Sequence, residues 1–314
     1  MSTPTTRRSF IKTTAAGAAA LAAASGAHAK GKDKGKREYG ISLAGWSLHR
    51  TIGEGEGKVP MLDMPKMTRE TWDIEAIELV SGMLPKTDKA YRDELAKNAA
   101  AHNVAIKLIM IDGQGSIGGV TPEECADAVK RHSEWIDYAA EFGCHSIRMN
   151  WAGAEKGTEK DDALLDAFVK RSVPGFQALC AYGDQKNINV IIENHGGPSS
   201  YPHAMDKLMA AVGHPRFGTL PDFGNFPPET DIYEAIDKLM PYAKALSAKC
   251  YDFDPATGLH TDKDNKMVDF EKMIEICVDK HGYHGFIGIE YEGSIMSEPD
   301  GIEAANNLLI KLRG

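Results

Sequence analysis

Short apolar runs alternate with longer amphipathic segments along most of this chain. Eight runs are rich in Ile, Val, Leu or Met, which is typical of parallel strands buried on both faces. Eight such alternations favour the α/β class and a single-domain (β/α)8 TIM barrel, with a doubly wound open sheet as the alternative. The eight predicted strands are residues 39–48, 74–80, 104–112, 146–151, 189–194, 218–224, 245–252 and 285–292.

The segments between these runs carry helix signals. Thr121 before Pro122, Glu123 and Glu124 predicts an N-cap, a first-turn proline and acids that complement the helix dipole. No glycine-rich phosphate loop follows the first strand, and the glycine-rich segment 53–57 is acidic, which disfavours the open-sheet alternative. The predicted helices are residues 89–102, 123–142, 161–186, 204–212, 231–244, 270–281 and 302–312.

The N-terminus has the order of features of an export signal. Residues 6–12 resemble the twin-arginine motif, an Ala-rich stretch follows from 13 to 25, and Ala27 and Ala29 fit a small-x-small cleavage site. The Ala-rich stretch is too short and too weakly apolar for a membrane anchor. We therefore expect a signal peptide at 1–29, a charged linker at 30–38, a barrel at 39–314, and a periplasmic location.

Charge and cysteine usage exclude several classes of protein. The net charge of −9 argues against nucleic acid as a partner, because phosphate contacts need clustered Lys and Arg. Five cysteines, an odd number without a CxxC pair, argue against a disulfide scaffold. A small carbohydrate is the expected partner, without a membrane anchor, and association into a homo-oligomer stays open.

Polar residues gather near the carboxyl ends of several predicted strands. Because alternate residues of a barrel strand point inward, each of these strands should deliver polar side chains to one end of the barrel. Such barrels place their active sites at the carboxyl ends of the strands. The inward residues are expected to be Glu78, Arg148, Asn150, Glu193, His195, Asp222, Ser247, Lys249, Glu290 and Glu292.

Three acids, Glu193, Asp222 and Glu290, fall at matching depth on three strands. Carboxylates that converge repel one another unless a cation lies among them. A hard divalent ion with oxygen ligands meets this need. The alternative is that each acid caps a strand and pairs with a loop Lys or Arg. The sequence thus predicts one divalent metal ion per chain: Mn, Mg, Zn or Co.

Four phrases of the chain resemble the sugar phosphate isomerase/epimerase family, whose fold is the xylose-isomerase-like TIM barrel. They are residues 77–79 (IEL), 192–195 (IENH), 221–225 (PDFGN) and 288–293 (GIEYEG), and they occur in the family's order. The resemblance implies metal ligands after the fifth and sixth strands and on the seventh and eighth. These positions correspond to Glu193, Asp222, a histidine without a clear match, and Glu290.

The chain departs from this family on the seventh strand. The family's phrase is His-x-Lys-Asp, whereas here Ser247 stands at the histidine position and Lys249 at the lysine. His195 could supply the missing nitrogen ligand, a water could fill the position, or the Lys249 ammonium could neutralise the carboxylates without a metal. The alternative for His195 is a strand-end histidine that bonds a loop or contacts substrate.

The resemblance implies a mechanism. A metal ion acting as a Lewis acid stabilises an enediolate while one carboxylate removes the proton next to a carbonyl and another group returns it. Glu193 and Glu290 are the implied acid/base pair, and Lys249 a candidate for polarising a carbonyl. The predicted substrate-binding residues are Glu78, Trp46, Asn150, Arg148 and His260.

Four functions remain open from the sequence. A metal-dependent isomerase or epimerase of a free sugar or sugar derivative is the leading hypothesis. A lyase or dehydratase acting on a keto-sugar or keto-glycoside would begin with the same proton abstraction. A non-catalytic sugar-binding barrel would be consistent with the lost histidine. An abasic-site endonuclease of the same fold is disfavoured by the acidic charge and by the few histidines at strand ends.

Overall fold

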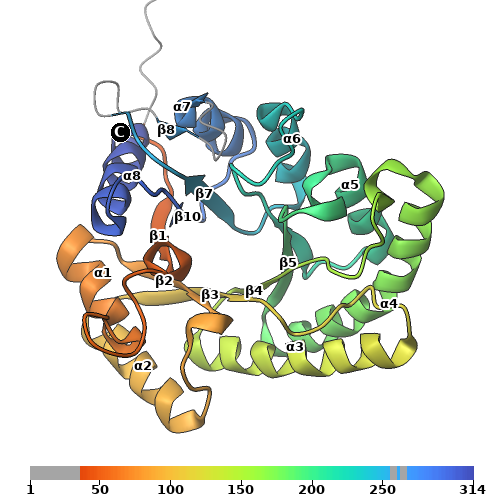
Figure 1. Ribbon diagram of the computed structural model, residues 1–314, viewed down its shortest axis with the longest axis horizontal. Helices are drawn as coiled ribbons and strands as arrows, with labels where there is room; N and C mark the ends of the chain where they lie inside the picture. Colours follow the sequence, from red (N-terminus) through yellow and green to blue (C-terminus); the bar gives the residue numbers. More distant parts are fainter. Residues whose placement is uncertain (1–35, 255–259, 262–266) are drawn as a thin grey trace, which may run out of the picture. The chain divides into compact units, whose positions relative to one another are not determined.

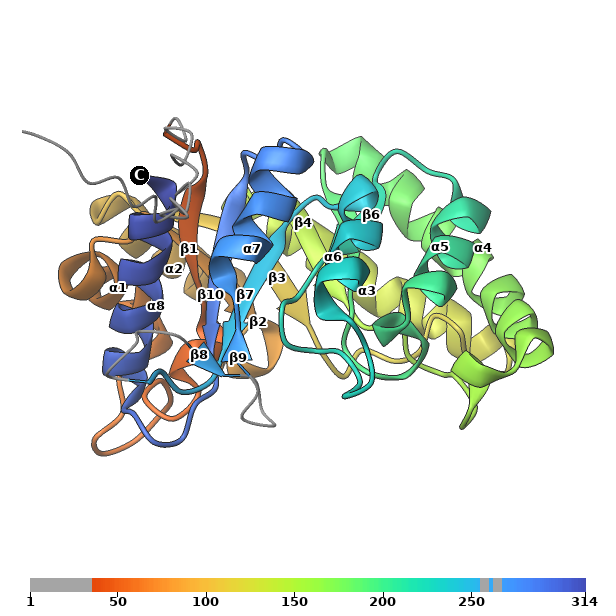
Figure 2. The same ribbon diagram turned by 90° about the horizontal axis from the view of Figure 1, so that it is seen from above.

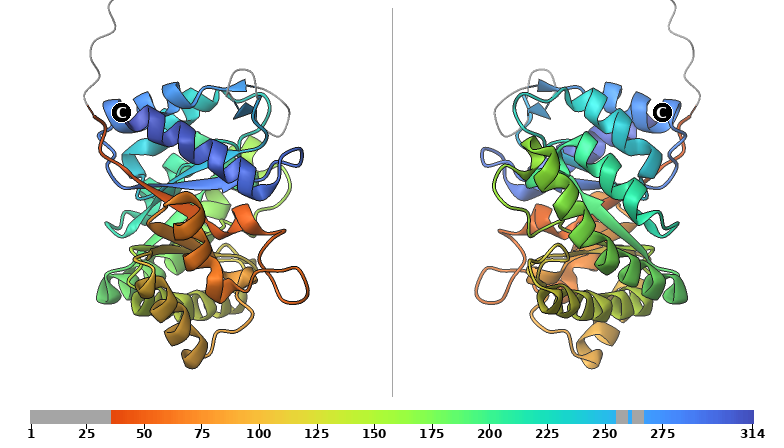
Figure 3. Two further views of the ribbon diagram at one scale, coloured as in Figure 1. Left: turned by 90° about the vertical axis from the view of Figure 1, so that its left-hand side faces the viewer. Right: turned by 90° about the vertical axis from the view of Figure 1, so that its right-hand side faces the viewer.

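The structure, a computed structural model, describes residues 36–254, 260–261 and 267–314. The expected signal peptide and most of the expected linker therefore lie outside the described residues. Residue 37 of that linker belongs to the folded unit. The buried Arg37 side chain donates to Asp279 and to the carbonyl of Leu312, and its backbone N–H bonds the carbonyl of Arg313. The first and last described segments thus lie side by side (Figure 3, left).

Eight parallel strands form the centre of this unit, as the sequence predicts, and the helices lie around them (Figure 1). The hydrogen-bonded order is β6-β5-β4-β3-β2-β1-β10-β7, so β1, β10 and β7 run side by side (Figure 2). The strands are β1 Gly40–Ala44, β2 Ala76–Val80, β3 Ala105–Ile111, β4 Ser146–Met149, β5 Asn189–Glu193, β6 Phe217–Leu220, β7 Leu246–Cys250 and β10 Phe286–Tyr291. A small antiparallel pair, β8 His260–Thr261 and β9 Met267–Val268, follows β7.

The barrel closes between β6 and β7 at a sparse seam. Among the described residues, three backbone hydrogen bonds cross it, from the N–H groups of Phe223, Ser247 and Lys244. Pro221 accepts one of them but has no N–H to donate, which keeps the ladder short here. Asp222 and Ser247 are direct bridge partners across this seam.

The helices confirm the seven predicted segments, and an eighth helix, α1, was not predicted. They are α1 Met64–Trp72, α2 Lys89–Ala101, α3 Pro122–Phe142, α4 Asp162–Lys186, α5 Pro202–Val212, α6 Ile232–Leu239, α7 Phe270–Ile274 and α8 Glu298–Arg313. Thr121 and Glu124 form the capping box that starts α3, and Gly143 ends it with φ +74°. A π-helical segment, Glu275–Lys280, continues α7. The short sequence of α1 lacks a long apolar period, so pattern reading missed it.

The core lies between the strands and the helices. Outward-facing strand residues such as Ile289, Tyr291, Ala248 and Cys250 are fully buried there, as the alternation predicts. All five cysteines are free thiols in this structure. Among the described residues, none of the helices combines the length and apolarity needed to cross a membrane.

Candidate functional site

Three buried carboxylates meet at the carboxyl ends of the strands. Glu193 is the last residue of β5, Asp222 follows β6, and Glu290 lies near the end of β10. One carboxylate oxygen from each lies within 4.8 Å of the other two, and all three side chains are buried. The convergence predicted from strand depth is therefore found in the structure.

Two buried cations lie among these acids. Arg148 Nε of β4 is 2.7 Å from Glu193 Oε2, and Lys249 Nζ of β7 is 3.1 Å from Glu290 Oε1. Lys249 Nζ also lies 3.2 Å from Glu292 Oε1. Burial opposes the Lys249 charge, but Glu290, Asp222 and their neighbours raise its pKa well above the ordinary value. The neighbouring carboxylates therefore favour the ammonium form of Lys249.

The charges of this cluster do not balance. If the acids Glu193, Asp222, Glu290 and Glu292 are ionised, Arg148 and Lys249 leave two negative charges uncompensated. Asp112 at the rim is a further acid beside Arg148. This excess of negative charge favours a bound divalent cation.

Asp222 is the acid of this group whose anionic form burial most clearly disfavours. Burial raises its pKa well above the ordinary value, the nearby Glu193 and Glu290 raise it further, and Lys249 opposes them. Its Oδ1 accepts the N–H of Gly224 at 2.8 Å, but Oδ2 has no hydrogen-bond partner among the described residues. A buried, unpaired carboxylate oxygen is costly, so this atom favours a cation as its partner.

Glu290 is held ionised by its surroundings. Burial alone would raise its pKa, but Lys249 and Arg148 outweigh burial and lower it. Ser247 Oγ donates to Glu290 Oε2 at 3.0 Å. Ser247, at the family's histidine position, thus points its hydroxyl toward the acids. The side-chain atoms of Glu193, Asp222, Glu290 and Ser247 that could bind a metal ion are all oxygens.

His195 does not join this group, contrary to the prediction that it faces inward as a nitrogen ligand. The strand β5 ends at Glu193, so the alternation that would point His195 inward stops two residues earlier. His195 is exposed, and its backbone N–H bonds Ser199 Oγ at 2.9 Å. The buried Asn194 instead links the neighbouring strands: its side chain donates to the Asp222 carbonyl and accepts the Asp222 N–H.

Glu78 lies deeper in the barrel than the three acids. Ser42 Oγ of β1 donates to its Oε1 at 2.6 Å, and a Cβ at Gly288 would lie 2.6 Å from the same oxygen. Burial raises the pKa of Glu78 to about 8, despite the bond from Ser42. Glu78 is therefore mostly neutral at pH 7, and it closes the floor of the site rather than its mouth.

Side chains at the rim of the site bond Arg148, Glu193 and Glu292. Asp112, after β3, accepts Arg148 at 2.9 Å and Asn150 at 2.8 Å, and Asn225 Nδ2 donates to Glu193 Oε1 at 2.7 Å. Tyr251 donates to Glu292 at 3.1 Å. Asp112, Asn225 and Tyr251 were not singled out from the sequence. Each lies within or directly beside a predicted strand run, which is the signal that could have found them.

Two of the predicted substrate-binding aromatic residues differ in their surroundings. Trp46, directly after β1, is 40% exposed, and its ring stacks on His49 with centroids 5.1 Å apart. His260 is buried, and its ring packs edge-on against Phe253 and Phe270. Trp46 is thus available to a ligand, whereas aromatic packing accounts for the burial of His260.

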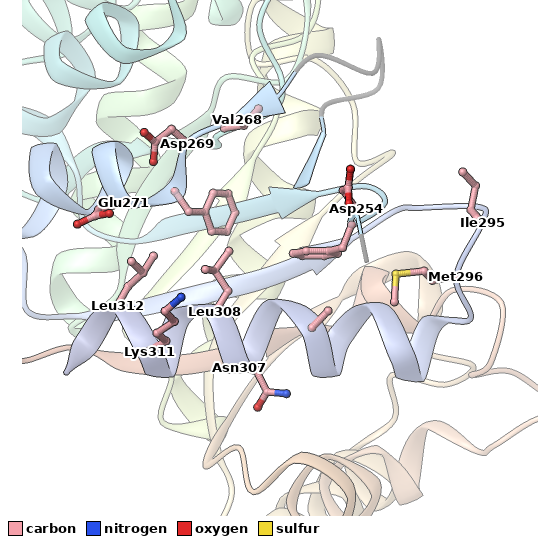
Figure 4. Close-up of a pocket in the computed structure, with 13 residues that line it drawn as sticks. Asp254, Val268, Asp269, Glu271, Ile295, Met296, Asn307, Leu308, Lys311 and Leu312 are labelled. Carbon is pink, nitrogen blue, oxygen red and sulfur yellow. The ribbon is translucent and has the colours of Figure 1, made fainter. Parts of the chain in front are cut away.

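A separate cavity of about 570 Å³ lies outside the strands, between α8 and the start of α7. Figure 4 shows Leu308, Lys311 and Leu312 of α8 on one side and Val268 and Asp269 on the other. None of the barrel-mouth acids lines it among the described residues. It is not part of the carboxylate site.

The sequence of this chain matches a known family of TIM barrels. The sequence model of the xylose isomerase-like TIM barrel family matches residues 68–312, so the chain belongs to that family. The matched span includes the acids Glu193, Asp222 and Glu290 and the cations Arg148 and Lys249. No curated protein sequence matches the chain.

Solved structures share the fold at low sequence identity. A xylose isomerase-like TIM barrel protein from Mycobacterium smegmatis in complex with magnesium has a TM-score of 0.64 and 20% identity, covering 88% of this chain and 98% of its own. The 3-keto-D-glucoside 4-epimerase of E. coli has a TM-score of 0.64 and 16% identity over 88% and 99%. The probable 3-DHS dehydratase of Bacillus anthracis has a TM-score of 0.65 and 16% identity over 86% and 98%.

Proposed function

We propose that this protein is a metal-dependent isomerase or epimerase of a free sugar or sugar derivative. The observation that carries the proposal is the buried group of Glu193, Asp222 and Glu290, three acids from three strands within 4.8 Å. Family membership supports chemistry on sugars, and the similar E. coli structure is an epimerase of a keto-glucoside.

The residues present fit one divalent ion, because the unpaired Asp222 Oδ2 lies among acids that outnumber the nearby cations. The donors are carboxylate oxygens with the Ser247 hydroxyl beside them, and no histidine belongs to the described group. Oxygen donors favour Mg²⁺ or Mn²⁺ over Zn²⁺ or Co²⁺. When bound, such an ion supplies Lewis acidity toward the oxygens of a sugar.

Glu193 and Glu290 are the proposed acid/base pair. Each is fixed by two partners: Asn225 and Arg148 hold Glu193, while Ser247 and Lys249 hold Glu290. One carboxylate would remove the proton next to the substrate carbonyl, giving an enediolate, and the other would return it. Two carboxylates anchored on different strands can serve opposite faces of one carbon atom.

Lys249 and the rim residues would bind the substrate. The Lys249 ammonium can donate a hydrogen bond to a carbonyl oxygen as negative charge develops there. Trp46, which is exposed, can stack on the apolar face of a sugar ring. Arg148 and Asn150, tied together through Asp112, would orient hydroxyl groups from the β3–β4 side.

A lyase is the second candidate. Removal of the same proton from a keto-sugar or keto-glycoside can expel a group from the β position instead of returning the proton. The fold similarity to the probable 3-DHS dehydratase supports this candidate. Product analysis separates the two, because elimination gives an unsaturated product whereas epimerisation conserves the composition.

The experiment that tests the proposal is metal analysis by elemental mass spectrometry. We expect about one Mg or Mn per chain in the purified protein, and its loss in a Glu193→Gln/Glu290→Gln double variant. Glu298→Gln is the matched control, since Glu298 is a buried acid that bonds Arg50 and Thr51 instead. Absence of metal even after incubation with excess ion would contradict the metal mechanism and favour Lys249-centred chemistry or a sugar-binding barrel.

Export is a separate proposal. We infer from the twin arginines at 7 and 8 and the alanines at 27 and 29 that the chain is exported to the periplasm and cleaved after residue 29. Fractionation of the producing cell should place the protein in the periplasm with an N-terminus at Lys30. An Arg7→Lys/Arg8→Lys variant should stay in the cytoplasm.

A further inference from the structure

A cavity of about 360 Å³ lies beside the carboxylate group, on the same end of the barrel. Its walls come from the three consecutive loops that follow β4, β5 and β6. The loops after parallel strands share the face on which such barrels carry out their chemistry. Six residues that line the cavity carry the argument: Glu159, His195, Tyr201, Asn225, Phe226 and Pro227.

Asn225 joins this cavity to the carboxylate group. It lines the cavity, and its Nδ2 donates to Glu193 Oε1 at 2.7 Å. A molecule whose reacting carbon lies at Glu193 would therefore extend over Asn225 into the cavity. A volume of about 360 Å³ falls in the range of small-molecule sites, so it would hold a further ring and not merely a hydroxyl group.

Hydrogen bonds hold the loops around this cavity in place. Ser200 Oγ donates to the Asn225 carbonyl at 2.7 Å and accepts the Gly196 N–H at 2.8 Å, which ties the β5 loop to the β6 loop. Gly196 has φ +85°, and a Cβ there would meet no atom within 4 Å. The backbone at Gly196 thus borders open space.

The lining combines the groups that bind sugars. Glu159 and Asn225 offer oxygen and nitrogen partners for hydroxyl groups, and the exposed His195 imidazole can both donate and accept. Tyr201, which is partly exposed, offers a ring face to the C–H side of a sugar. None of the described residues that line the cavity is a lysine or an arginine, so a phosphate group would find no counter-charge there.

We propose that this cavity is a subsite for a second, uncharged sugar ring, and that the substrate is a disaccharide or a comparable glycoside. The reacting ring would lie over the carboxylates and the second ring between the β4, β5 and β6 loops. This inference rests on the proposed function, because it extends the substrate of that same site. His195 thereby acts in substrate binding, which is the alternative to metal ligation that the sequence left open.

The test compares the affinity for glucose with that for maltose, cellobiose and trehalose, measured by titration calorimetry in Mg²⁺ buffer. We expect at least one disaccharide to bind about tenfold more tightly than glucose, the gain from one or two further hydrogen bonds. A Glu159→Ala/His195→Ala variant should lose this preference and keep its affinity for glucose. His195→Gln, which retains hydrogen bonding, should keep part of the preference.

Three results would overturn the subsite. The first is equal affinity for glucose and all three disaccharides in the unmodified protein. The second is an unchanged disaccharide preference in the double variant. The third is tighter binding of glucose 6-phosphate than of any disaccharide, which would contradict an uncharged second ring. Measuring the metal content of the same samples distinguishes failure of the proposed function from failure of the subsite. A protein that binds no metal but still prefers disaccharides would contradict the metal-dependent function and support the subsite.

Discussion

Replacing Lys249 by Met should destabilise the protein strongly when no metal is present. The ammonium lies 3.1 Å from Glu290 and 3.2 Å from Glu292, and its side chain is only 2% exposed. Methionine has a similar length but no charge, so the cluster would face Arg148 as its one remaining cation among the residues described above. Removing one partner of a buried ion pair typically costs about 3–5 kcal/mol.

For a domain of this size, each kcal/mol lowers the melting temperature by about 2–4 °C, so the expected loss is roughly 10 °C. The assay is thermal unfolding followed by circular dichroism at pH 7 in the presence of a chelator. Lys207→Met is the matched control. Lys207 also contacts two acids, Asp162 and Asp166, but at the surface, where water screens the charges and no resolvable change is expected.

The effect of Lys249→Met should depend on pH in a defined direction. Lys249 lowers the pKa of Glu290, so the pair stabilises the fold above the ordinary pKa of a carboxyl group and loses this contribution as the pH falls. The difference between the variant and the unmodified protein should therefore be largest at neutral pH and shrink toward pH 4. If Lys249→Met is as stable as the unmodified protein at pH 7 in chelator, Lys249 does not stabilise the carboxylate cluster by charge and this reasoning is wrong.

Three further predictions concern the floor and the wall of the site. Ser247→His would offer a nitrogen ligand beside Asp222. After dialysis against mixed metals, the variant should therefore retain Zn or Co, whereas the unmodified protein retains Mg or Mn. An unchanged metal content would mean that residue 247 does not coordinate the ion. Gly288→Ala would put a methyl group 2.6 Å from Glu78 Oε1 and should cost about 1–3 kcal/mol in urea unfolding, and no loss would mean that Glu78 lies elsewhere. Because Glu78 has a raised pKa of about 8 in the fold, it keeps its proton when the unfolded chain loses it, so stability should fall between about pH 4.5 and 8. Glu78→Gln should flatten this slope in chelator, whereas an equally steep slope would assign it to another group.

The barrel could be predicted from the sequence because its signals are local. Each buried parallel strand is a short apolar run, and helix signals such as the Thr121–Glu124 capping box separate most of these runs. The same alternation placed Ser247 and Lys249 inward and Cys250 outward, as found. Helix α1 was missed because it has only nine residues and its buried face includes the polar Thr68.

The parts of the site that could not be predicted depend on where each strand stops. If β5 continued, the alternation of its side chains would point His195 into the barrel. The strand ends at Glu193, however, and His195 is exposed. Contacts between distant segments were also out of reach, such as Asn225 with Glu193 or Asp112 with Arg148. His260 is buried against Phe253 and Phe270 and lies in the small strand pair β8–β9. The two-residue strands of this pair are too short to give an alternating pattern in the sequence.

The seam between β6 and β7 gives the carboxylate group a mechanical role. Asp222 lies on one side of the seam and Ser247 on the other, next to Glu290, where few backbone hydrogen bonds close the circle. Any fluctuation that separates β6 from β7 also separates Asp222 from Glu290. Opening of the sheet at this seam therefore disrupts the arrangement of the three carboxylates. A metal ion bound by these acids would hold β6 and β7 together. The backbone amides of the seam would then exchange with solvent more slowly in the metal-bound protein than in the metal-free protein.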